Sequence, residues 1–294
     1  MRDLIIFIDD TDSETSEKGT GGIAEEIMEL VKNEFNAKTT YVTRHQFLIH
    51  PDVPYTSHNS SMGFECSVPD DTDINALIQA CFDHLKSESC PESDPGLCVA
   101  DKSKMDADLL IRFGKECKRR LMTKAEAYET AERAHVYLNE AGGTGDGVIG
   151  ALGGVGLRFW GSDGTLKGKP KKLEDECAHK VKDLIKNPLI DEVRDTEGNI
   201  LNPEEEVWLE KKPKVSLINH KLTVIVKDKD ENGIWQIMDK NKARWLGGDI
   251  IFREGCDDFT PDVEEERESD DKNCYNCLYR RWLENGILCQ KPKE

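Results

Sequence analysis

A short apolar run that ends abruptly in acidic residues is the feature of this sequence that most limits its fold. Leu4 to Ile8 consists only of branched and aromatic residues, and Asp9-Asp10-Thr11-Asp12 follows directly. A run of this length and composition is typical of a buried strand, so the acids are expected at its carboxyl end. After a glycine-bearing loop, apolar residues recur at helical spacing between Ile23 and Val31. The sequence therefore predicts an α/β (α+β) fold that begins with a strand, a loop and a helix.

The rest of the chain divides by its hydrophobic patterns. Further strands are expected at 39–42, 46–50, 62–68 and 134–138, and helices at about 72–87, 106–119, 123–134 and 173–186. Short strands with turns between them are expected at 215–218, 222–226 and 234–238. The segment from Cys90 to Cys98 is predicted to be a polar loop, with no role for either cysteine.

Three domains follow from this organisation, somewhat more than a length of 294 residues at roughly 150 per domain would give. Residues 1–186 are predicted to form a domain with a mixed sheet, 187–255 a small β domain, and 256–294 an acidic linker with a cysteine-bearing tail. In the β domain, Trp235 and Trp245 are interpreted as core residues. The alternative is base stacking on a small barrel, as in oligonucleotide-binding folds.

Charge and hydropathy restrict the environment and the partners. The chain has 40 Lys and Arg against 58 Asp and Glu, a net charge of −18, so most of its surface should repel nucleic acid. Any RNA would have to meet a local basic patch, and 167–172 is the most lysine-rich stretch. No run approaches the ~18 apolar residues of a membrane span, and the first apolar run is too short for an export signal. We therefore expect a cytoplasmic protein, with no membrane partner, whose ten cysteines are reduced thiols or metal ligands.

The acidic motif is the first candidate site. In an extended chain alternate side chains share a side, so Asp10 and Asp12 could converge on one cation while Asp9 faces the other way. Magnesium is commonly held by one or two carboxylates together with phosphates and water. The alternative is an acidic loop in which Asp12 or Ser13 caps a turn.

A glycine-rich segment is the second candidate. Gly142-Gly143-Thr144-Gly145-Asp146-Gly147 precedes an apolar, helix-like run at 148–157. Glycines let backbone amides approach a phosphate at a helix N-terminus, although Asp146 would repel phosphate without a metal. A flexible turn is the alternative. The further glycines within the helical run are expected to pack closely against a sheet or a ligand.

Together with a third segment, these motifs resemble the catalytic region of the archaeal tRNA agmatidine synthetases, the TiaS family. The resemblance lies in Ile8-Asp9-Asp10-Thr11-Asp12-Ser13, in 50–59, and in Gly145-Asp146-Gly147-Val148-Ile149-Gly150-Ala151-Leu152, in that order, and covers about residues 1–160. It implies a kinase-like domain that uses ATP and magnesium to phosphorylate an anticodon cytidine of an isoleucine tRNA. An amine, agmatine, then displaces the phosphate.

The resemblance also implies roles for individual residues. Asp9, Asp10 and Asp12 would hold magnesium and phosphates, with Thr20 as the nearest hydroxyl. Gly145, Gly147 and Gly150 would line the nucleotide site, and Asn59 would meet substrate. From the sequence itself, Gly143 and Thr144 are added to the nucleotide site, and His58, one of the histidines around the proline-containing loop, is a second candidate for contact with substrate.

The chain departs from the family pattern in two places. Gly21-Gly22-Ile23 stands where the family has a threonine pair, and Asp146 stands where arginine is common. Two other functions therefore stay open: an ATP-dependent phosphotransferase or ligase acting on a small molecule, and a catalytically inactive nucleotide-binding protein.

The cysteines near the end of the chain are the third candidate site. Cys274 and Cys277 have the C-x-x-C spacing, and Cys256 and Cys289 could complete a structural zinc site. An iron–sulfur cluster, or redox or unliganded thiols, are the alternatives.

Overall fold

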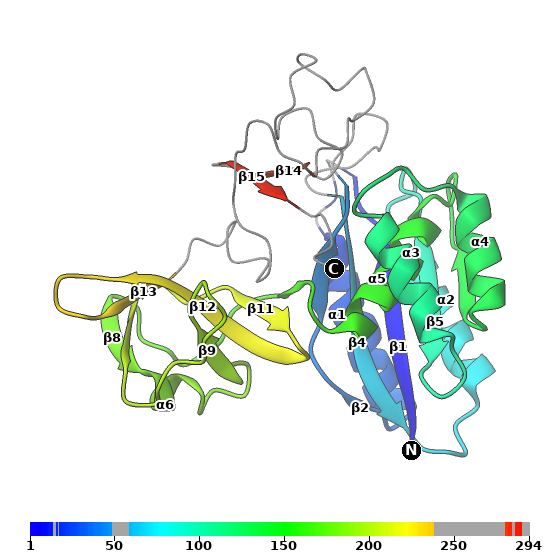
Figure 1. Ribbon diagram of the computed structural model, residues 1–294. Helices are drawn as coiled ribbons and strands as arrows, with labels where there is room; N and C mark the ends of the chain where they lie inside the picture. Colours follow the sequence, from blue (N-terminus) through cyan, green and yellow to red (C-terminus); the bar gives the residue numbers. More distant parts are fainter. Residues whose placement is uncertain (14–15, 17, 49–58, 238–279, 284–285, 290–294) are drawn as a thin grey trace, which may run out of the picture. The chain divides into compact units, whose positions relative to one another are not determined.

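The computed structural model describes residues 1–13, 16, 18–48, 59–237, 280–283 and 286–289 (Figure 1). The chain divides into two compact units, residues 1–160 and 161–294. Each unit contains helices and strands of its own, so the predicted α/β class is confirmed. No described helix has the length and apolar character needed to cross a bilayer.

The first unit is built on a sheet with the strand order β6-β5-β1-β4-β3, and β2 pairs with β4. Its pairings are antiparallel, and the predicted first strand, β1, lies at the centre. The strands are β1 (Arg2–Asp9), β2 (Lys38–Thr39), β3 (Thr43–Gln46), β4 (Ser60–Val68), β5 (Gly96–Asp101) and β6 (Tyr137–Glu140).

Helices cover both faces of this sheet, which explains why β1 has no polar face. Leu4, Ile6 and Ile8 belong to one apolar cluster with residues of α1 and α2. Ile5 and Phe7 belong to a second cluster, with residues of α3, α4 and α5. The helices are α1 (Thr20–Glu34), α2 (Ile74–Glu88), α3 (Ala107–Glu116), α4 (Lys124–Arg133) and α5 (Gly147–Trp160). Side-chain caps begin three of them: Asp73 for α2, Asp106 for α3 and a Thr123–Glu126 capping box for α4.

The prediction of a polar loop over 90–98 is wrong at its carboxyl end. Cys98 lies in β5, next to the central strand, and is fully buried. The apolar residues that mark this strand, Leu97 to Ala100, follow a stretch rich in proline, serine and acids, which hid its start. The predicted strands at 39–42 and 46–50 match β2 and β3 only in part, and residues 49–50 lie outside the described part of the chain.

The second unit has the strand order β7-β11-β12-β13-β10-β8, with β9 parallel to β12. Its elements are β7 (Thr165–Leu166), β8 (Cys177–Lys180), α6 (Val181–Leu184), β9 (Glu192–Arg194), β10 (Glu206–Leu209), β11 (Val215–Ile218), β12 (Lys221–Lys229) and β13 (Trp235–Ile237). Strands β14 (Arg280–Leu283) and β15 (Gly286–Cys289) pair with each other. The three predicted short strands are confirmed as β11, β12 and β13. Asn219 and His220 both have positive φ in the hairpin turn between β11 and β12.

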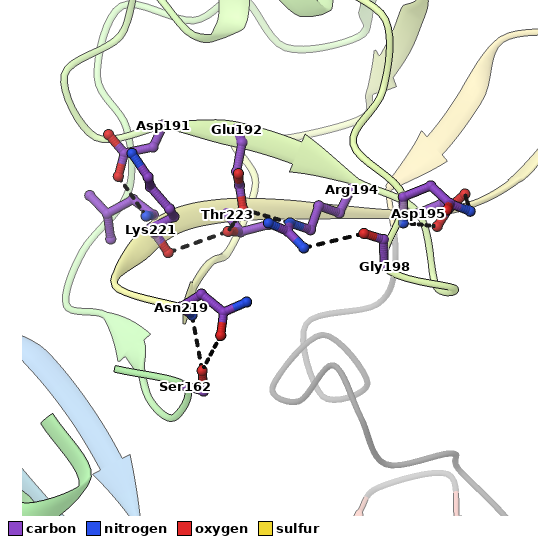
Figure 2. Close-up of polar contacts among 11 residues, drawn as sticks. Ser162, Asp191, Glu192, Arg194, Asp195, Gly198, Asn219, Lys221 and Thr223 are labelled. Atoms are coloured by element: carbon purple, nitrogen blue, oxygen red, sulfur yellow. Dashed lines mark hydrogen bonds and ion pairs between the residues drawn. The ribbon is translucent and has the colours of Figure 1, made fainter. Parts of the chain in front are cut away.

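Polar side chains join β9 to β12 in the second unit (Figure 2). Glu192 accepts a hydrogen bond from Thr223 Oγ1 at 3.0 Å and pairs with Arg194 at 2.6 Å. Directly before β9, the Asp191 carboxylate accepts a hydrogen bond from the backbone N–H of Leu222 at 2.7 Å. These contacts fix the short strand β9, which has only three residues of its own to pair.

The predicted helix at 173–186 is wrong. This segment contains β8 and a single helical turn, α6, because its charged residues provide helix propensity without an apolar stripe to bury. The predicted domain boundary at 186 differs from the observed division, since residues 161–186 contribute β7 and β8 to the second unit. The boundary predicted at 255 lies outside the described residues, and a barrel of the oligonucleotide-binding type stays a prediction.

Candidate functional site

The acidic motif leaves the sheet at the end of β1, as the sequence predicts. Asp9 is the last residue of the strand and is buried, and its carboxylate accepts a hydrogen bond from the Asp10 N–H at 2.9 Å. Asp10 has φ of +52°, so the chain turns out of the extended conformation here. Burial, and then the neighbouring charges of Asp10 and Asp12, raise the pKa of Asp9 well above its ordinary value.

The glycine-rich segment meets the acidic motif directly. A Cβ added to Gly150 in α5 would collide with the Asp9 carboxylate, and one added to Gly147 would lie 2.8 Å from the Asp9 carbonyl oxygen. Real Cβ atoms essentially never approach this closely, so only glycine fits at these two positions. Close packing of this helix against the sheet is confirmed at Gly150 and Gly154, whereas Gly156 packs against α3. The two motifs, more than 130 residues apart in sequence, form one site.

Negative charge is concentrated around Asp10. Partial burial and then the carboxylates of Asp94, Asp12 and Asp146, in that order, together raise its pKa to about 6. Several carboxylates gathered around one position mark a place where a cation would be favoured. All of these donors are hard oxygen atoms, which is the donor chemistry that suits magnesium.

A hydroxyl chain connects the acidic motif to the start of α1. The Thr20 hydroxyl donates to Asp12 at 2.8 Å and accepts from Thr11 Oγ1 at 3.1 Å. Thr20 is the first residue of α1, so this chain holds Asp12 beside the helix N-terminus. The ammonium group nearest in sequence, that of Lys18, pairs with Glu26 at 2.7 Å and with Glu88 at 2.6 Å.

Asn59 makes two hydrogen bonds to the segment that follows β3. Its side-chain N–H donates to the Leu48 carbonyl at 2.7 Å, and its own carbonyl accepts from Phe47 at 2.8 Å. Ile8 pairs with Met62, so the start of β4 and the end of β1 lie at the same end of the sheet. Asn59, directly before β4, therefore lies at the end of the sheet from which the acidic motif emerges. Its side-chain amide is bound to the segment after β3. His58 lies outside the described residues.

The glycine loop itself is held by charged side chains. Thr144 is exposed, and its carbonyl accepts a hydrogen bond from Lys124, which also pairs with Glu140 at 2.9 Å. Gly143 and Gly145 have φ of +57° and +76°. Thr144 therefore lies between two glycines in the left-handed backbone region, and the nucleotide site expected here stays a prediction.

The segment 90–95, between α2 and β5, contacts both the acidic motif and the glycine-rich segment, which the sequence does not predict. The Cys90 N–H donates to the Thr11 carbonyl at 2.9 Å, and the Gly147 N–H donates to the Asp94 carbonyl at 2.9 Å. One signal could have found it: Asp94-Pro95-Gly96 stands directly before an apolar run, just as the acidic motif stands directly after one.

The predicted metal sites lie partly within the described residues. Within the described ranges, no group of three or more His, Cys, Asp or Glu side chains is arranged to hold a metal ion. Magnesium that shares its coordination with phosphates needs only one or two carboxylates, so Asp10 and Asp12 still fit it. The predicted zinc ligands Cys256, Cys274 and Cys277 lie outside the described residues, and Cys289 is the last residue of β15. The zinc site stays a prediction.

Comparisons with known proteins give matches to solved structures alone. No protein-family model and no curated protein matches the sequence. TiaS bound to an isoleucine tRNA and ATP is 23% identical over 53% of this chain and 36% of that chain, with a TM-score of 0.47. A tRNA fluorescent labeling enzyme is 24% identical over 52% and 36%, with a TM-score of 0.45. Apo TiaS, a tRNA agmatidine synthetase, is 23% identical over 52% and 35%, with a TM-score of 0.43. The match thus spans about a third of each of these proteins, which include the family that the sequence motifs resemble.

Proposed function

We propose that this chain is an ATP- and magnesium-dependent tRNA-modifying enzyme of the agmatidine synthetase type. It would phosphorylate a cytidine of the tRNA anticodon, and an amine such as agmatine would then displace the phosphate. The observation that carries the proposal is that the acidic motif lies against the glycine-rich segment at Asp9 and Asp10. Phosphoryl transfer requires mainly positioning and neutralisation of charge, and a carboxylate cluster beside a glycine-rich loop suits both tasks.

The acidic residues have different tasks in this proposal. Asp10 and Asp12 are the residues that would hold magnesium, which neutralises phosphate charge when it is bound. Asp9 is buried against α5 and orients the turn through its bond to the Asp10 N–H. Thr20 holds Asp12 in place, because its hydroxyl donates to that carboxylate.

The glycine loop would receive the nucleotide. Gly143 and Thr144 are exposed and Gly145 is buried next to them, close to the N-terminus of α5, where the helix dipole favours an anion. Asp146 is exposed, and its negative charge opposes a phosphate, so nucleotide binding at this loop depends on a cation. The proposal therefore requires that ATP binds much more tightly with magnesium than without it.

A small-molecule acceptor is the second candidate, and the net charge of −18 favours it. An acidic surface repels RNA, whereas a small amine or alcohol is indifferent to it or attracted. The lysine-rich stretch 167–172 is the local basic patch that a tRNA would need. Consumption of ATP that requires tRNA supports the first candidate, and consumption that requires a small amine or alcohol alone supports the second.

The deciding experiment is calorimetric titration of ATP into the full chain, with and without magnesium. Magnesium-dependent binding is expected, and Asp10→Ala should weaken it at least tenfold, roughly 1.4 kcal/mol or more. Asp71→Ala removes an exposed carboxylate in the turn before α2 and serves as the matched control, with unchanged binding. Absence of binding to a folded protein would overturn the proposal, and binding without turnover for any acceptor would leave a nucleotide-binding protein.

A further inference from the structure

The segment 90–95 connects the two halves of the site. At one end, the Cys90 N–H donates to the Thr11 carbonyl, and the Cys90 thiol lies 3.3 Å from Ser13 Oγ. At the other end, the Pro95 carbonyl accepts from Ala141 at 2.7 Å, just before the glycine loop. A single short segment therefore contacts both the acidic motif and the chain that leads into the glycine loop.

Within this segment, Asp94 makes the contacts to the glycine loop itself. Its carboxylate accepts a hydrogen bond from the Thr144 N–H, and its carbonyl accepts from the Gly147 N–H at 2.9 Å. The loop thus has one amide bound on each side of Gly145. Gly143, at φ of +57°, lies so close that a Cβ there would collide with the Asp94 carboxylate.

The turn that carries Asp94 is itself ordered by hydrogen bonds. Ser93 is buried, and both its N–H (3.0 Å) and its hydroxyl (2.7 Å) donate to the Cys90 carbonyl. Asp94 is half-buried between this turn and the first residues of β5. The carboxylate therefore projects from a fixed backbone, which is what a residue needs in order to hold a loop.

We propose that Asp94 is a positioning residue, which fixes the glycine loop against the acidic motif in the arrangement that receives the nucleotide. The inference rests on the proposed function for the identity of the ligand and on the hydrogen bonds above for the position of the loop. A flexible glycine-rich loop loses conformational entropy when it orders around a phosphate. Asp94 removes much of this cost before the ligand arrives, and the benefit appears as affinity.

Two substitutions separate positioning from charge. Asp94→Ala removes the acceptor for the Thr144 N–H. Asp94→Asn keeps one oxygen acceptor at the same position, removes the charge and replaces the second oxygen with an amide N–H donor. Hydrogen exchange of the full chain, read by mass spectrometry over 142–148, reports on the loop without any nucleotide. We expect exchange at Thr144 to rise about tenfold in Asp94→Ala and to stay within about threefold of the parent in Asp94→Asn.

Affinity for ATP with magnesium supplies the second measurement. We expect the Kd to rise about tenfold in Asp94→Ala and by a smaller factor in Asp94→Asn, which keeps the acceptor but loses the negative charge near Asp10, with Asp71→Ala as the unchanged control. If Asp94→Ala does not fold, Gly143→Ala disturbs the same contact from the loop side and should raise exchange over 142–148 in the same way.

The outcomes distinguish this inference from the proposed function. Unchanged exchange in both Asp94→Ala and Gly143→Ala would overturn the positioning role, whatever ATP does. A rise in exchange that Asp94→Asn does not reverse would also overturn it. If the parent protein binds no ATP, the proposed function fails, and the exchange measurements still decide whether Asp94 holds the loop.

Discussion

Asp10 is the residue whose environment gives the clearest pH dependence. Its pKa is raised from 3.8 to about 6 in the folded protein, so the folded state holds a proton that the unfolded state releases. The stability contributed by this proton is fully present below pH 3.8, and it is lost as the pH rises through 6. At neutral pH the ionised carboxylate therefore destabilises the fold.

Replacing Asp10 with asparagine should remove this penalty. We expect Asp10→Asn to raise the free energy of unfolding by about 1–2 kcal/mol at pH 7, and to have little effect near pH 4. The measurement is a urea titration at both pH values, with the amide protection of β1 as the probe. A variant that is less stable than the parent at pH 7, or equally affected at both pH values, would contradict the assigned environment.

At this scale the sequence predicts the residues with charge or with unusual flexibility. Asp9, Asp10 and the glycine loop stand out in the sequence because their chemistry is concentrated in short runs. Asp94 does not, because an isolated aspartate in a proline- and serine-containing loop has no pattern around it. Its role depends on a hydrogen bond to Thr144, which is 50 residues later in the sequence. The spacing of residues in the sequence does not predict such a contact.

Among the elements, the last turn of α5 is tied to β4 by a buried ion pair. Arg158 is only 3% exposed, and its Nε lies 2.9 Å from Glu65 Oε1. The guanidinium also lies over the ring of Tyr41 at 4.6 Å. Arg158 Nη1 has no hydrogen-bond partner within the described part of the chain. Glu65 therefore supplies the compensating charge for a cation with few other partners.

Removing the Glu65 carboxylate alone should lower the free energy of unfolding far more than removing Glu65 and Arg158 together. We expect Glu65→Ala to destabilise the first unit by about 3 kcal/mol, because it leaves a buried guanidinium uncompensated. The double variant Glu65→Ala/Arg158→Met should recover most of this loss, since it buries no unpaired charge. Chemical denaturation of the two variants and of Arg158→Met provides the double-mutant cycle, and additive effects would show that the pair is not coupled.

The elements that the sequence predicted correctly are those whose hydrophobic pattern is complete within a short segment of the chain. β1 is recognisable because helices cover both faces of the sheet, and β11 to β13 because short apolar runs alternate with turns. The helix expected at 173–186 failed for the opposite reason: charged residues are compatible with several structures, and the pairing of β8 with β10 decides between them. That pairing joins segments about 30 residues apart.

At the scale of the whole molecule, the two units have apolar cores made of different residues. The two clusters on either side of the first sheet contain only residues between Leu4 and Trp160. In the second unit, Val193, Leu217 and Val224 are among the buried residues of its own sheet. The sequence predicted a boundary at 186, whereas the observed division lies at 160–161, so the lysine-rich linker and β8 belong to the second unit.

A ligand of the first unit should therefore stabilise that unit alone. At a concentration of ATP with magnesium of 100 times its Kd, linkage predicts about 2.7 kcal/mol of additional stability for the unit that binds it. Hydrogen exchange during a urea titration can follow residues 1–160 and 161–237 separately in one sample. We expect the urea midpoint of the first segment to rise with ATP and magnesium, and that of the second to stay unchanged.

Asp10→Ala is the matched control for this measurement, because it should remove the shift in the first segment while both units remain folded. Equal shifts in the two segments would mean that they unfold as one cooperative unit, which separate cores do not predict. A shift confined to the second segment would place the nucleotide away from the acidic motif. A shift confined to the first, and lost in Asp10→Ala, would tie nucleotide binding to the end of β1, because no other change in the protein separates the two samples.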